Sequence, residues 1–314
     1  MDVFPGIDAA AGRLDGAAVT IGNFDGVHLG HRRLLERAQA HARRLSSKAV
    51  ALTFWPHPAR LLAPDYAPPL ITSRHRRLEL LAEAGCDAVV EQPFDRAFAD
   101  LSPAEFNALL LERLRARAVV VGYDFTYGKG RAGRVETLRL ACEEQGATLE
   151  VVPPVTVDGL VASSTKVREF VLAGNVEGAR TLLGRDFELE GPVVRGDGLG
   201  RTIGVPTANL AAEQELVPAI GVYATRVRLP GGEWALGACN VGLNPTFHPE
   251  SEGGLTSRAL SIEVHVLDHS LDLYGQTLRL SFAARLRAER RFPTVAALVA
   301  QIRADILETR RLLG

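Results

Sequence analysis

Cysteine and net charge are both scarce in this chain of 314 residues. Its three cysteines lie far apart and form no Cys-x-x-Cys pair: Cys86, Cys142 and Cys239. Cysteines so few and so scattered exclude a disulfide framework and favour a reducing cytoplasm. The formal net charge is only −1, which excludes the general attraction of a basic chain to nucleic acid or to a membrane surface. We therefore predict a cytoplasmic protein that acts without nucleic acid or a membrane.

Long hydrophobic runs, internal repeats and low-complexity tracts are also absent from the sequence. No apolar run is long enough to cross a bilayer. The stretch Met1–Pro5 lacks the basic and apolar segments of a signal peptide, so we expect none. The composition is ordinary for a globular protein, with 46% hydrophobic and 23% charged residues, and the length corresponds to one or two domains.

The first half of the chain alternates strand patterns with helical patterns. Short apolar runs predict strands at 19–21, 49–54, 88–90, 118–121 and 148–152. Helical spacing of apolar residues follows the first strand, and Ser102-Pro-Ala-Glu105 is a capping box that begins another helix. This alternation predicts an α/β domain with a parallel sheet and flanking helices. Ligands of such sheets bind at the carboxyl ends of the strands.

The pattern changes after two short helical stretches near 165–173 and 176–183. Five strand patterns separated by Gly, Pro and Asn follow, at 188–195, 222–229, 234–241, 259–267 and 277–282. No helix-length segment interrupts them, which predicts an all-β module, a small barrel. Apolar residues at helical spacing over 295–313 predict a helix that closes the chain. We expect the two domains to span 1–184 and 185–314.

The stretch 19–31 runs from a strand through a glycine-punctuated turn into a helix. Gly22 and Gly26 allow backbone conformations or close approaches that a Cβ would block. The helix start has unpaired N–H groups and a partial positive charge, which suit an anion. His28 and His31 lie about one turn apart on one side of this start. We expect phosphate chemistry here.

Two other interpretations of the histidine pair remain open. Histidines at this spacing can bind a metal ion such as zinc, although the sequence has no HExxH and no closely spaced third ligand. They can also be exposed polar residues, but the glycines and the strand-to-helix context agree with a site.

Three further stretches follow predicted strands of the same sheet. His57 projects from a rigid, proline-rich turn, where a histidine is often structural. Gly122–Gly133 is glycine-rich, basic and aromatic, which suits a flat ring beside phosphates, although it could be an ordinary mobile loop. It is no Walker A loop, because Gly130 stands where Ser or Thr is needed. Ser163–Arg168 begins a helix with a capping hydroxyl and an arginine that can hold phosphate, or it is a plain cap with a surface arginine.

These stretches resemble the motifs of a known family. Gly22–His31 resembles the HxGH signature of the nucleotidyltransferase superfamily, and Ser163–Arg168 resembles its ISSTxxR partner, with Ala162 in place of the usual Ile. The TFxPHP and GxDFxxGxxRxG stretches narrow the resemblance to the FMN adenylyltransferase domain of bacterial bifunctional riboflavin kinase/FAD synthetases. The resemblance extends over nearly the whole chain.

This resemblance implies adenylyl transfer from ATP to FMN, which yields FAD and pyrophosphate, with Mg²⁺ bridging the phosphates. Positioning and charge stabilisation would dominate the catalysis. His28 and His31 would contact the ATP phosphates. The leaving pyrophosphate would be held by Ser164, Thr165 and Arg168. The remaining assignments are Gly22, Asn23, Phe24 and Gly30 for ATP, and His57 and Asp124 for the flavin.

The densest motif of the second half is Gly196–Asn209. Its glycines allow a backbone flap over phosphates, and Thr207 and Asn209 offer oxygen ligands suited to Mg²⁺. An ordinary glycine-rich hairpin is the other interpretation. In the strand pattern 260–266, Leu260, Ile262, Val264 and Val266 are predicted to face the core, and Ser261, Glu263 and His265 the other side. Glu263 is there either a solvent-side residue or a carboxylate that lines a site.

Pro206–Asn209 matches the Pro-Thr-Ala-Asn marker of the riboflavin kinase family. Four other stretches also fit this family: Gly200-Arg201, Asn240–Gly242, Asn244–Thr246 and Asp272–Gly275. Val205 stands where Phe is common, and Asn244 where Arg is common. The resemblance implies a six-stranded barrel with a C-terminal helix. It also implies that Glu263 is the general base for the ribityl 5′-hydroxyl. The other implied assignments are Gly200, Arg201 and Thr207 for ATP, Thr207 and Asn209 for Mg²⁺, and Arg287 and Glu289 for the flavin.

Together these features predict a bifunctional enzyme that phosphorylates riboflavin to FMN and then adenylates FMN to FAD. One alternative is a riboflavin kinase whose first domain has lost activity, against which the intact His28, His31 and Arg168 argue. Another is a transferase of the HxGH superfamily for nicotinate or pantetheine phosphate, against which the kinase motif argues. A third is a barrel that only binds nucleic acid or a regulator, which the neutral charge disfavours.

Overall fold

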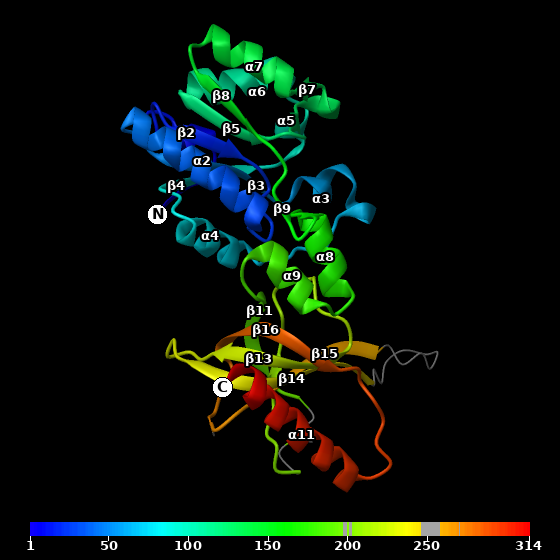
Figure 1. The fold of residues 1–314 in the computed structure, drawn as a ribbon. Coiled ribbons are helices and arrows are strands. Elements are labelled where there is room, and N and C mark those ends of the chain that lie inside the picture. The colour runs from blue at the N-terminus through cyan, green and yellow to red at the C-terminus, as the bar shows by residue number, and fades with distance from the viewer. Residues whose placement is uncertain (197–199, 201–202, 246–257, 270) are drawn as a thin grey trace. The chain divides into compact units, whose positions relative to one another are not determined.

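The computed structural model describes residues 1–196, 200, 203–245, 258–269 and 271–314, and its elements are labelled in Figure 1. Its contacts divide the chain into two compact units. The first unit consists of Met1–Pro68 and Arg74–Ser164, and the second of Pro69–Ser73 and Thr165–Gly314. Helices α8 (Ser164–Leu172) and α9 (Val176–Leu183) thus lie almost entirely in the second unit, whereas the predicted boundary at 184 falls after both.

The first unit is built on a six-stranded parallel sheet in the order β1-β4-β3-β2-β5-β8. Its strands are β1 (Asp2–Phe4), β2 (Ala18–Ile21), β3 (Ala49–Trp55), β4 (Ala88–Pro93), β5 (Ala118–Gly122) and β8 (Thr148–Val152). The predicted parallel sheet is confirmed, with one additional edge strand. Strand β1 was not predicted, because it has three residues of which only Phe4 is buried, too few for a periodic pattern.

Helices cover both faces of this sheet (Figure 1). The helices of the first unit are α1 (Ile7–Ala10), α2 (Leu29–Leu45), α3 (Pro58–Leu62), α4 (Arg74–Glu83), α5 (Arg96–Ala99), α6 (Pro103–Ala108) and α7 (Val135–Glu144), with single turns η1 (Pro64–Tyr66), η2 (Leu109–Arg113) and η3 (Lys129–Arg131). Short strand pairs are formed by β6 (Thr126–Tyr127) with β7 (Gly133–Arg134), and by β9 (Thr156–Val157) with β10 (Leu160–Val161). The predicted capping box at Ser102 and Glu105 is present.

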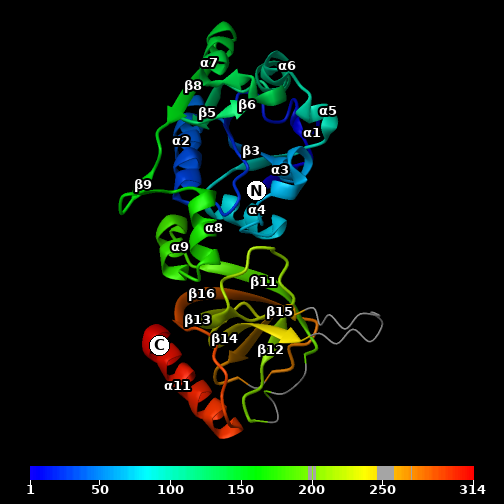
Figure 2. The same ribbon diagram turned by 90° about the vertical axis from the view of Figure 1, so that its right-hand side faces the viewer.

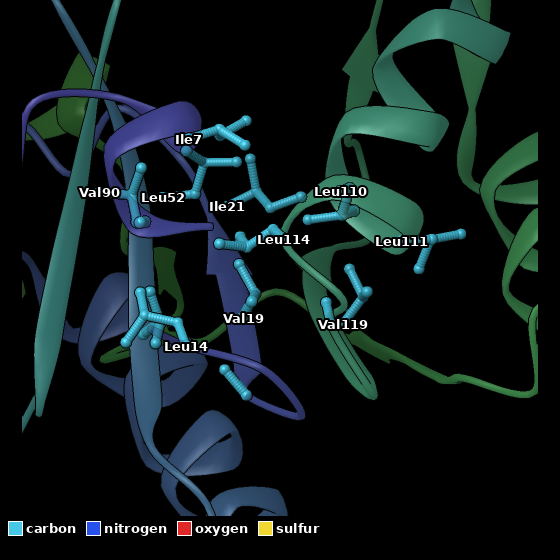
Figure 3. Packing of buried hydrophobic residues seen from close by; sticks show 14 of the residues in the cluster. Ile7, Leu14, Val19, Ile21, Leu52, Val90, Leu110, Leu111, Leu114 and Val119 are labelled. Atoms are coloured by element: carbon cyan, nitrogen blue, oxygen red, sulfur yellow. The ribbon is translucent and has the colours of Figure 1, made fainter. Parts of the chain in front are cut away.

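Successive strand residues are buried on opposite faces, which explains why the strands appear as continuous apolar runs. On β3, Val50 and Leu52 pack with α1, α6 and α7, whereas Ala51 packs with α2 and α4. Figure 3 shows the first of these clusters, where Ile7 of α1 lies beside Ile21 and Leu52. A sheet buried on both faces leaves only its strand ends and edges for ligands.

The second unit contains a closed antiparallel barrel in the order β11-β12-β15-β14-β13-β16 (Figure 2). Its strands are β11 (Phe187–Val194), β12 (Ala208–Leu210), β13 (Gly221–Arg228), β14 (Trp234–Pro245), β15 (Arg258–Val266) and β16 (Thr277–Arg287). The predicted barrel is confirmed. Five strands follow from the sequence pattern alone, and the sixth, β12, overlaps the end of the Pro206–Asn209 motif, where three residues are too few to reveal it.

The predicted closing helix, α11 (Val295–Leu313), is present and packs against the barrel strands β13, β14 and β16. Five of its apolar residues are partly buried: Leu298, Val299, Ile302, Ile306 and Leu313. Val295 is the exception at 63% exposed, and the buried residues of the helix are Asp305 and Thr309. A salt bridge of 2.8 Å joins Asp305 to Arg287 of β16 and pairs this buried carboxylate.

The predicted alternation on β15 holds for Ile262, Val264 and Val266, which are buried. It fails for Leu260, which is 46% exposed. Leu260 pairs only with Leu243 on β14, beyond the last pairing of β14 with β13 at Val241. The two strands continue there as a two-stranded extension, so no barrel interior remains to cover Leu260.

Among the helices of the described part of the chain, none combines the length and the apolar character that crossing a bilayer requires.

The three cysteines provide a test of how well the two units exclude solvent from their interiors. Cys86, Cys142 and Cys239 are free and buried. Burial raises the pKa of the Cys86 thiol to about 12 and that of Cys142 to about 11, and it also raises the pKa of Cys239. Because only the thiolate reacts, we expect Ellman's reagent at pH 8 to react at least ~10²-fold more slowly with the native protein than with the protein unfolded in urea. Equal rates would contradict the burial of the three thiols.

Candidate active site

A cavity with a volume of about 600 Å³ lies at the carboxyl ends of the parallel strands in the first unit. Ile21, Phe54, Gly122 and Val152, at or near the ends of four strands, line it. Seven of the residues predicted to bind substrate also line it: Gly22, Asn23, His28, Gly30, His31, Asp124 and Ser164. The expected edge of the sheet therefore carries a cavity of the size that small ligands need.

The two histidines form a compact pair at the start of α2. His28 caps the helix, and its Nδ1 accepts a hydrogen bond of 3.4 Å from the backbone N–H of His31. The imidazole rings are stacked, with centroids 3.7 Å apart and planes inclined by 21°. Because the N–H groups of the first turn lie beside both rings, this corner of the cavity suits an anion such as phosphate.

Position 30, two residues after His28, has little room for a side chain, which explains the glycine there. A Cβ at this position would lie 3.0 Å from the carbonyl oxygen of Ala162 and 3.0 Å from the ring of His28. The glycine therefore lets the segment before α8 lie directly against the start of α2. The hydroxyl of Ser164 then donates a hydrogen bond of 2.9 Å to the carbonyl of Asp25, which joins two motifs 139 residues apart.

Phe24 does not contact the cavity, although the motif assigns it to ATP. Its side chain is fully buried, and its ring meets that of His31 edge-on at a centroid distance of 5.2 Å. The Phe24 ring therefore supports His31 from behind, and a contact of Phe24 with ATP stays a prediction.

His57 caps a helix next to the cavity. It is 9% exposed, and its Nδ1 accepts a hydrogen bond of 3.2 Å from the backbone N–H of Ala59, which caps α3. Pro58 and Leu62 of that helix line the cavity, whereas His57 does not. His57 thus has a capping role, and its contact with the flavin stays a prediction, whereas Asp124 lies on the cavity wall.

One side of the cavity is aromatic, and the sequence predicted only part of it. Six aromatic side chains are in successive ring contact, with centroids 5.0 to 6.2 Å apart: Phe54, Phe94, Phe98, Phe106, Tyr127 and Phe125. All six line the cavity. Only Phe125 and Tyr127 lie in the Gly122–Gly133 stretch, and the other four come from separate segments. Such a surface suits a flat, apolar ring system.

Thr165 and Arg168 belong to the second unit. Arg168 is 9% exposed, and its Nε donates a hydrogen bond of 2.8 Å to the carbonyl of Pro69 in the same unit. Their contact with pyrophosphate stays a prediction.

In the barrel, Glu263 lies in a polar row that crosses three strands. It pairs directly with Asn209 on β12 and with Asn240 on β14, so the three side chains share one face. Its neighbours Ile262 and Val264 are buried on the opposite face. The hydroxyl of Thr207 donates to the Glu263 carboxylate at 3.4 Å. Asn240 belongs to a motif noted in the sequence, but only the strand register reveals its place beside Glu263.

The glycines before β12 lie directly on this row. A Cβ at Gly196 would collide with the amide of Asn209, and a Cβ at Gly200 would lie 3.1 Å from the hydroxyl of Thr207. The close approach explains the glycines. Arg201, assigned to ATP by the motif, lies outside the described residues.

Glu289 and Arg287 have different surroundings. A Cβ at Gly242 would lie 3.0 Å both from the Asn240 amide nitrogen and from the Glu289 carboxylate, which places Glu289 at the Asn240 end of the row. Arg287 is instead bound to Asp305 of α11 and lies 5.7 Å over the ring of Phe292. Arg287 thus braces β16 against α11, and its contact with the flavin stays a prediction.

Among the residues that the structure describes, no group of three or more His, Cys, Asp or Glu side chains could hold a metal ion. The zinc interpretation of His28 and His31 thus has no third such ligand within this part of the chain. The donors around Glu263 are a hydroxyl, an amide and a carboxylate, the hard oxygen ligands that Mg²⁺ prefers.

Comparison with known proteins decides the family. Residues 11–166 match the model of the FAD synthetase family, and residues 183–313 match that of the riboflavin kinase family. The bifunctional riboflavin kinase/FMN adenylyltransferase of Escherichia coli (strain K12) is 39% identical over 96% of this chain and 94% of that protein. The chain belongs to the bifunctional riboflavin kinase/FMN adenylyltransferase family. It is a transferase that phosphorylates riboflavin to FMN and adenylates FMN to FAD, with ATP as the second substrate of both reactions.

Other relatives also match this chain over nearly its whole length. The bifunctional riboflavin kinase/FMN adenylyltransferase of Bacillus subtilis (strain 168) is 34% identical over 94% of this chain and 92% of that protein. A crystal structure titled as a macrolide-efflux protein from Streptococcus pneumoniae matches with a TM-score of 0.88 and 32% identity, and covers 99% of both chains. These matches support the bifunctional enzyme over the three alternatives, which were a kinase whose first domain has lost activity, another transferase of the HxGH superfamily and a binding module.

The close contact at Gly30 yields a prediction. We expect Gly30→Ala to lower FAD formation from FMN by at least ~10-fold, because the new methyl group pushes the His28 ring or the Ala162 carbonyl away from its place. FMN formation from riboflavin should not change. Gly231→Ala is the matched control, since Gly231 has open space around its Cβ position. Separation of the flavins by chromatography measures both reactions, and unchanged FAD formation would contradict the close packing.

Proposed function

We propose that the cavity of the first unit is the site of adenylyl transfer and that the polar row around Glu263 is the site of riboflavin phosphorylation. The stacked pair of His28 and His31 at the start of α2 is the observation that carries the first assignment. The direct pairing of Glu263 with Asn209 and Asn240 carries the second.

In the adenylyl transfer site, the ATP phosphates lie at the start of α2. The imidazoles of His28 and His31 and the first N–H groups of the helix stabilise the charge that develops as an FMN phosphate oxygen attacks the α-phosphorus. The bond from the α-phosphorus to the bridging oxygen breaks, and pyrophosphate leaves. The phosphate nucleophile is already ionised, so the protein needs no general base, and positioning supplies most of the rate.

The two substrates use different sides of this cavity. Gly22, Asn23 and Gly30 lie at its polar end and suit the nucleotide, whereas the six-ring aromatic surface suits the isoalloxazine ring of FMN. Asp124 lies on the cavity wall just after the end of β5, where its carboxylate can accept hydrogen bonds from a ligand. Ser164, Thr165 and Arg168 hold the departing pyrophosphate.

In the kinase site, the Glu263 carboxylate accepts the proton of the ribityl 5′-hydroxyl as that oxygen attacks the γ-phosphorus of ATP. The bond from the γ-phosphorus to the bridging oxygen breaks, and ADP leaves. Thr207 and Asn209 offer a hydroxyl and an amide oxygen beside Glu263, and they would hold Mg²⁺. That ion, when bound, neutralises charge on the phosphate oxygens. We assign Gly200 and Arg201 to the ATP phosphates and Glu289 to the flavin.

The two reactions share FMN as product and substrate, so the partners are small molecules, riboflavin, FMN and ATP. We place the enzyme in the cytoplasm, without nucleic acid or membrane partners. Three free, buried cysteines and a net charge of −1 support this proposal.

The kinase assignment predicts a selective loss. Glu263→Gln keeps the shape of the side chain but removes the base, so we expect riboflavin kinase turnover to fall by roughly 10²–10⁴-fold. FAD formation from supplied FMN should persist. Glu233→Gln, on an exposed turn of the same barrel, is the control and should leave both rates unchanged. Loss of both activities in Glu263→Gln would show that Glu263 is structural.

The converse prediction concerns the first unit. His31→Ala removes one of the two stacked imidazoles, so we expect FAD formation from FMN to fall by at least ~10²-fold while FMN formation continues. His75→Ala, which removes a largely exposed histidine on α4, serves as the control. If His31→Ala forms FAD at the normal rate, the histidine pair has no part in adenylyl transfer.

A further inference from the structure

A pair of opposite charges is buried beside the adenylyl transfer site. Arg77 of α4 and Glu91 of β4 are joined by a salt bridge of 2.9 Å, and each side chain is 3% exposed. Burying two charges carries a desolvation penalty that their attraction often fails to offset, so such a pair is weak evidence of a contribution to stability. The other contacts of Arg77 and Glu91 can explain why this pair is buried here.

The second contact of Arg77 is the backbone of the histidine turn. Its Nη1 donates a hydrogen bond of 3.3 Å to the carbonyl of Asn23 and lies 3.5 Å from the carbonyl of Phe54. The hydroxyl of Thr53 donates to the same Asn23 carbonyl at 3.2 Å. Asn23 and Phe54 both line the cavity. A buried cation thus holds the backbone where β2 and β3 end.

This turn needs external support. Phe24 and Val27 adopt left-handed backbone conformations, with φ of 50° and 39°, although neither is glycine. Residues in this region are strained and persist only where their surroundings hold them. The Ser164 hydroxyl holds the carbonyl of Asp25, and Arg77 with Thr53 holds that of Asn23.

Arg77 is itself fixed on two sides. Glu91 accepts from Arg77 with one carboxylate oxygen, and its other oxygen accepts from Nε of Arg74 at 2.7 Å. The ring of Trp55 lies 5.4 Å from the Arg77 guanidinium and 5.6 Å from that of Arg74. An arginine held by a carboxylate and an aromatic ring has little freedom, so it can define the position of the carbonyl that it binds.

We propose that Arg77, held by Glu91, is a positioning residue for adenylyl transfer, because it fixes the turn that carries Asn23 and leads to His28. The inference rests on the proposed role of the cavity. Arg77 touches no substrate, so its loss displaces the groups that do. We therefore expect the effect in kcat for FAD formation rather than in the KM for ATP.

The test compares two neighbouring buried arginines. Arg77→Met should lower kcat for FAD formation by ~10²-fold and leave the KM for ATP within ~3-fold. Arg76→Met is the matched control, because Arg76 is also buried on α4 but pairs with Glu79 and Glu83 of its own helix, at 2.8 and 2.6 Å. It should keep kcat within ~3-fold. Riboflavin kinase activity of each preparation, together with thermal unfolding, reports whether the protein is folded.

A second variant separates positioning from stability. Arg77→Met/Glu91→Leu removes both charges, so it should recover the melting temperature lost in Arg77→Met while FAD formation stays low. Recovery of both would overturn the proposal and make the pair purely structural. Equal losses in Arg76→Met and Arg77→Met would also overturn it. Normal FAD formation in His31→Ala would instead refute the site itself, whereas a defect in His31→Ala with normal Arg77→Met refutes only the positioning role.

Discussion

The close approach at the start of α2 is the constraint on which the first unit depends. His28 caps the helix, and Gly30 leaves the space into which the Ala162 carbonyl fits. The helix start, the histidine rings and the segment before α8 therefore meet at one point. Because parallel strands end at the same edge of their sheet, the loops after β3, β5 and β8 surround this point and complete the cavity.

Strand register has the corresponding role in the barrel. Antiparallel pairing brings Asn209, Glu263 and Asn240 into one row from three separate motifs. A shift of the strand register by one residue would turn Glu263 into the barrel interior and Val264 to the surface. It would therefore disrupt both the core and the site. The apolar residues that alternate with Glu263 thus position the carboxylate as well as stabilise the barrel.

The limits of prediction follow from the length and the range of each signal. Strands β1 and β12 have three residues each, so neither shows a periodic pattern. His57 and Phe24 stand in genuine motifs, yet a cap and full burial occupy their side chains. Asp305 illustrates the reverse case, a charged residue buried on α11 because Arg287 meets it there. For Asp305 a partner on another element decides the role, whereas the cap of His57 lies only two residues away at Ala59.

Local sequence patterns were enough to predict the parallel sheet, the barrel, the closing helix and the four motifs that carry the chemistry. These features depend on turn glycines, helix caps and apolar periodicity, which act over a few residues. Only the tertiary structure decided that six aromatic rings form one wall, that Asn240 lies beside Glu263, and that Arg77 holds Asn23 from behind. Those contacts join segments distant in the chain, and no local pattern encodes which distant partner a side chain will meet.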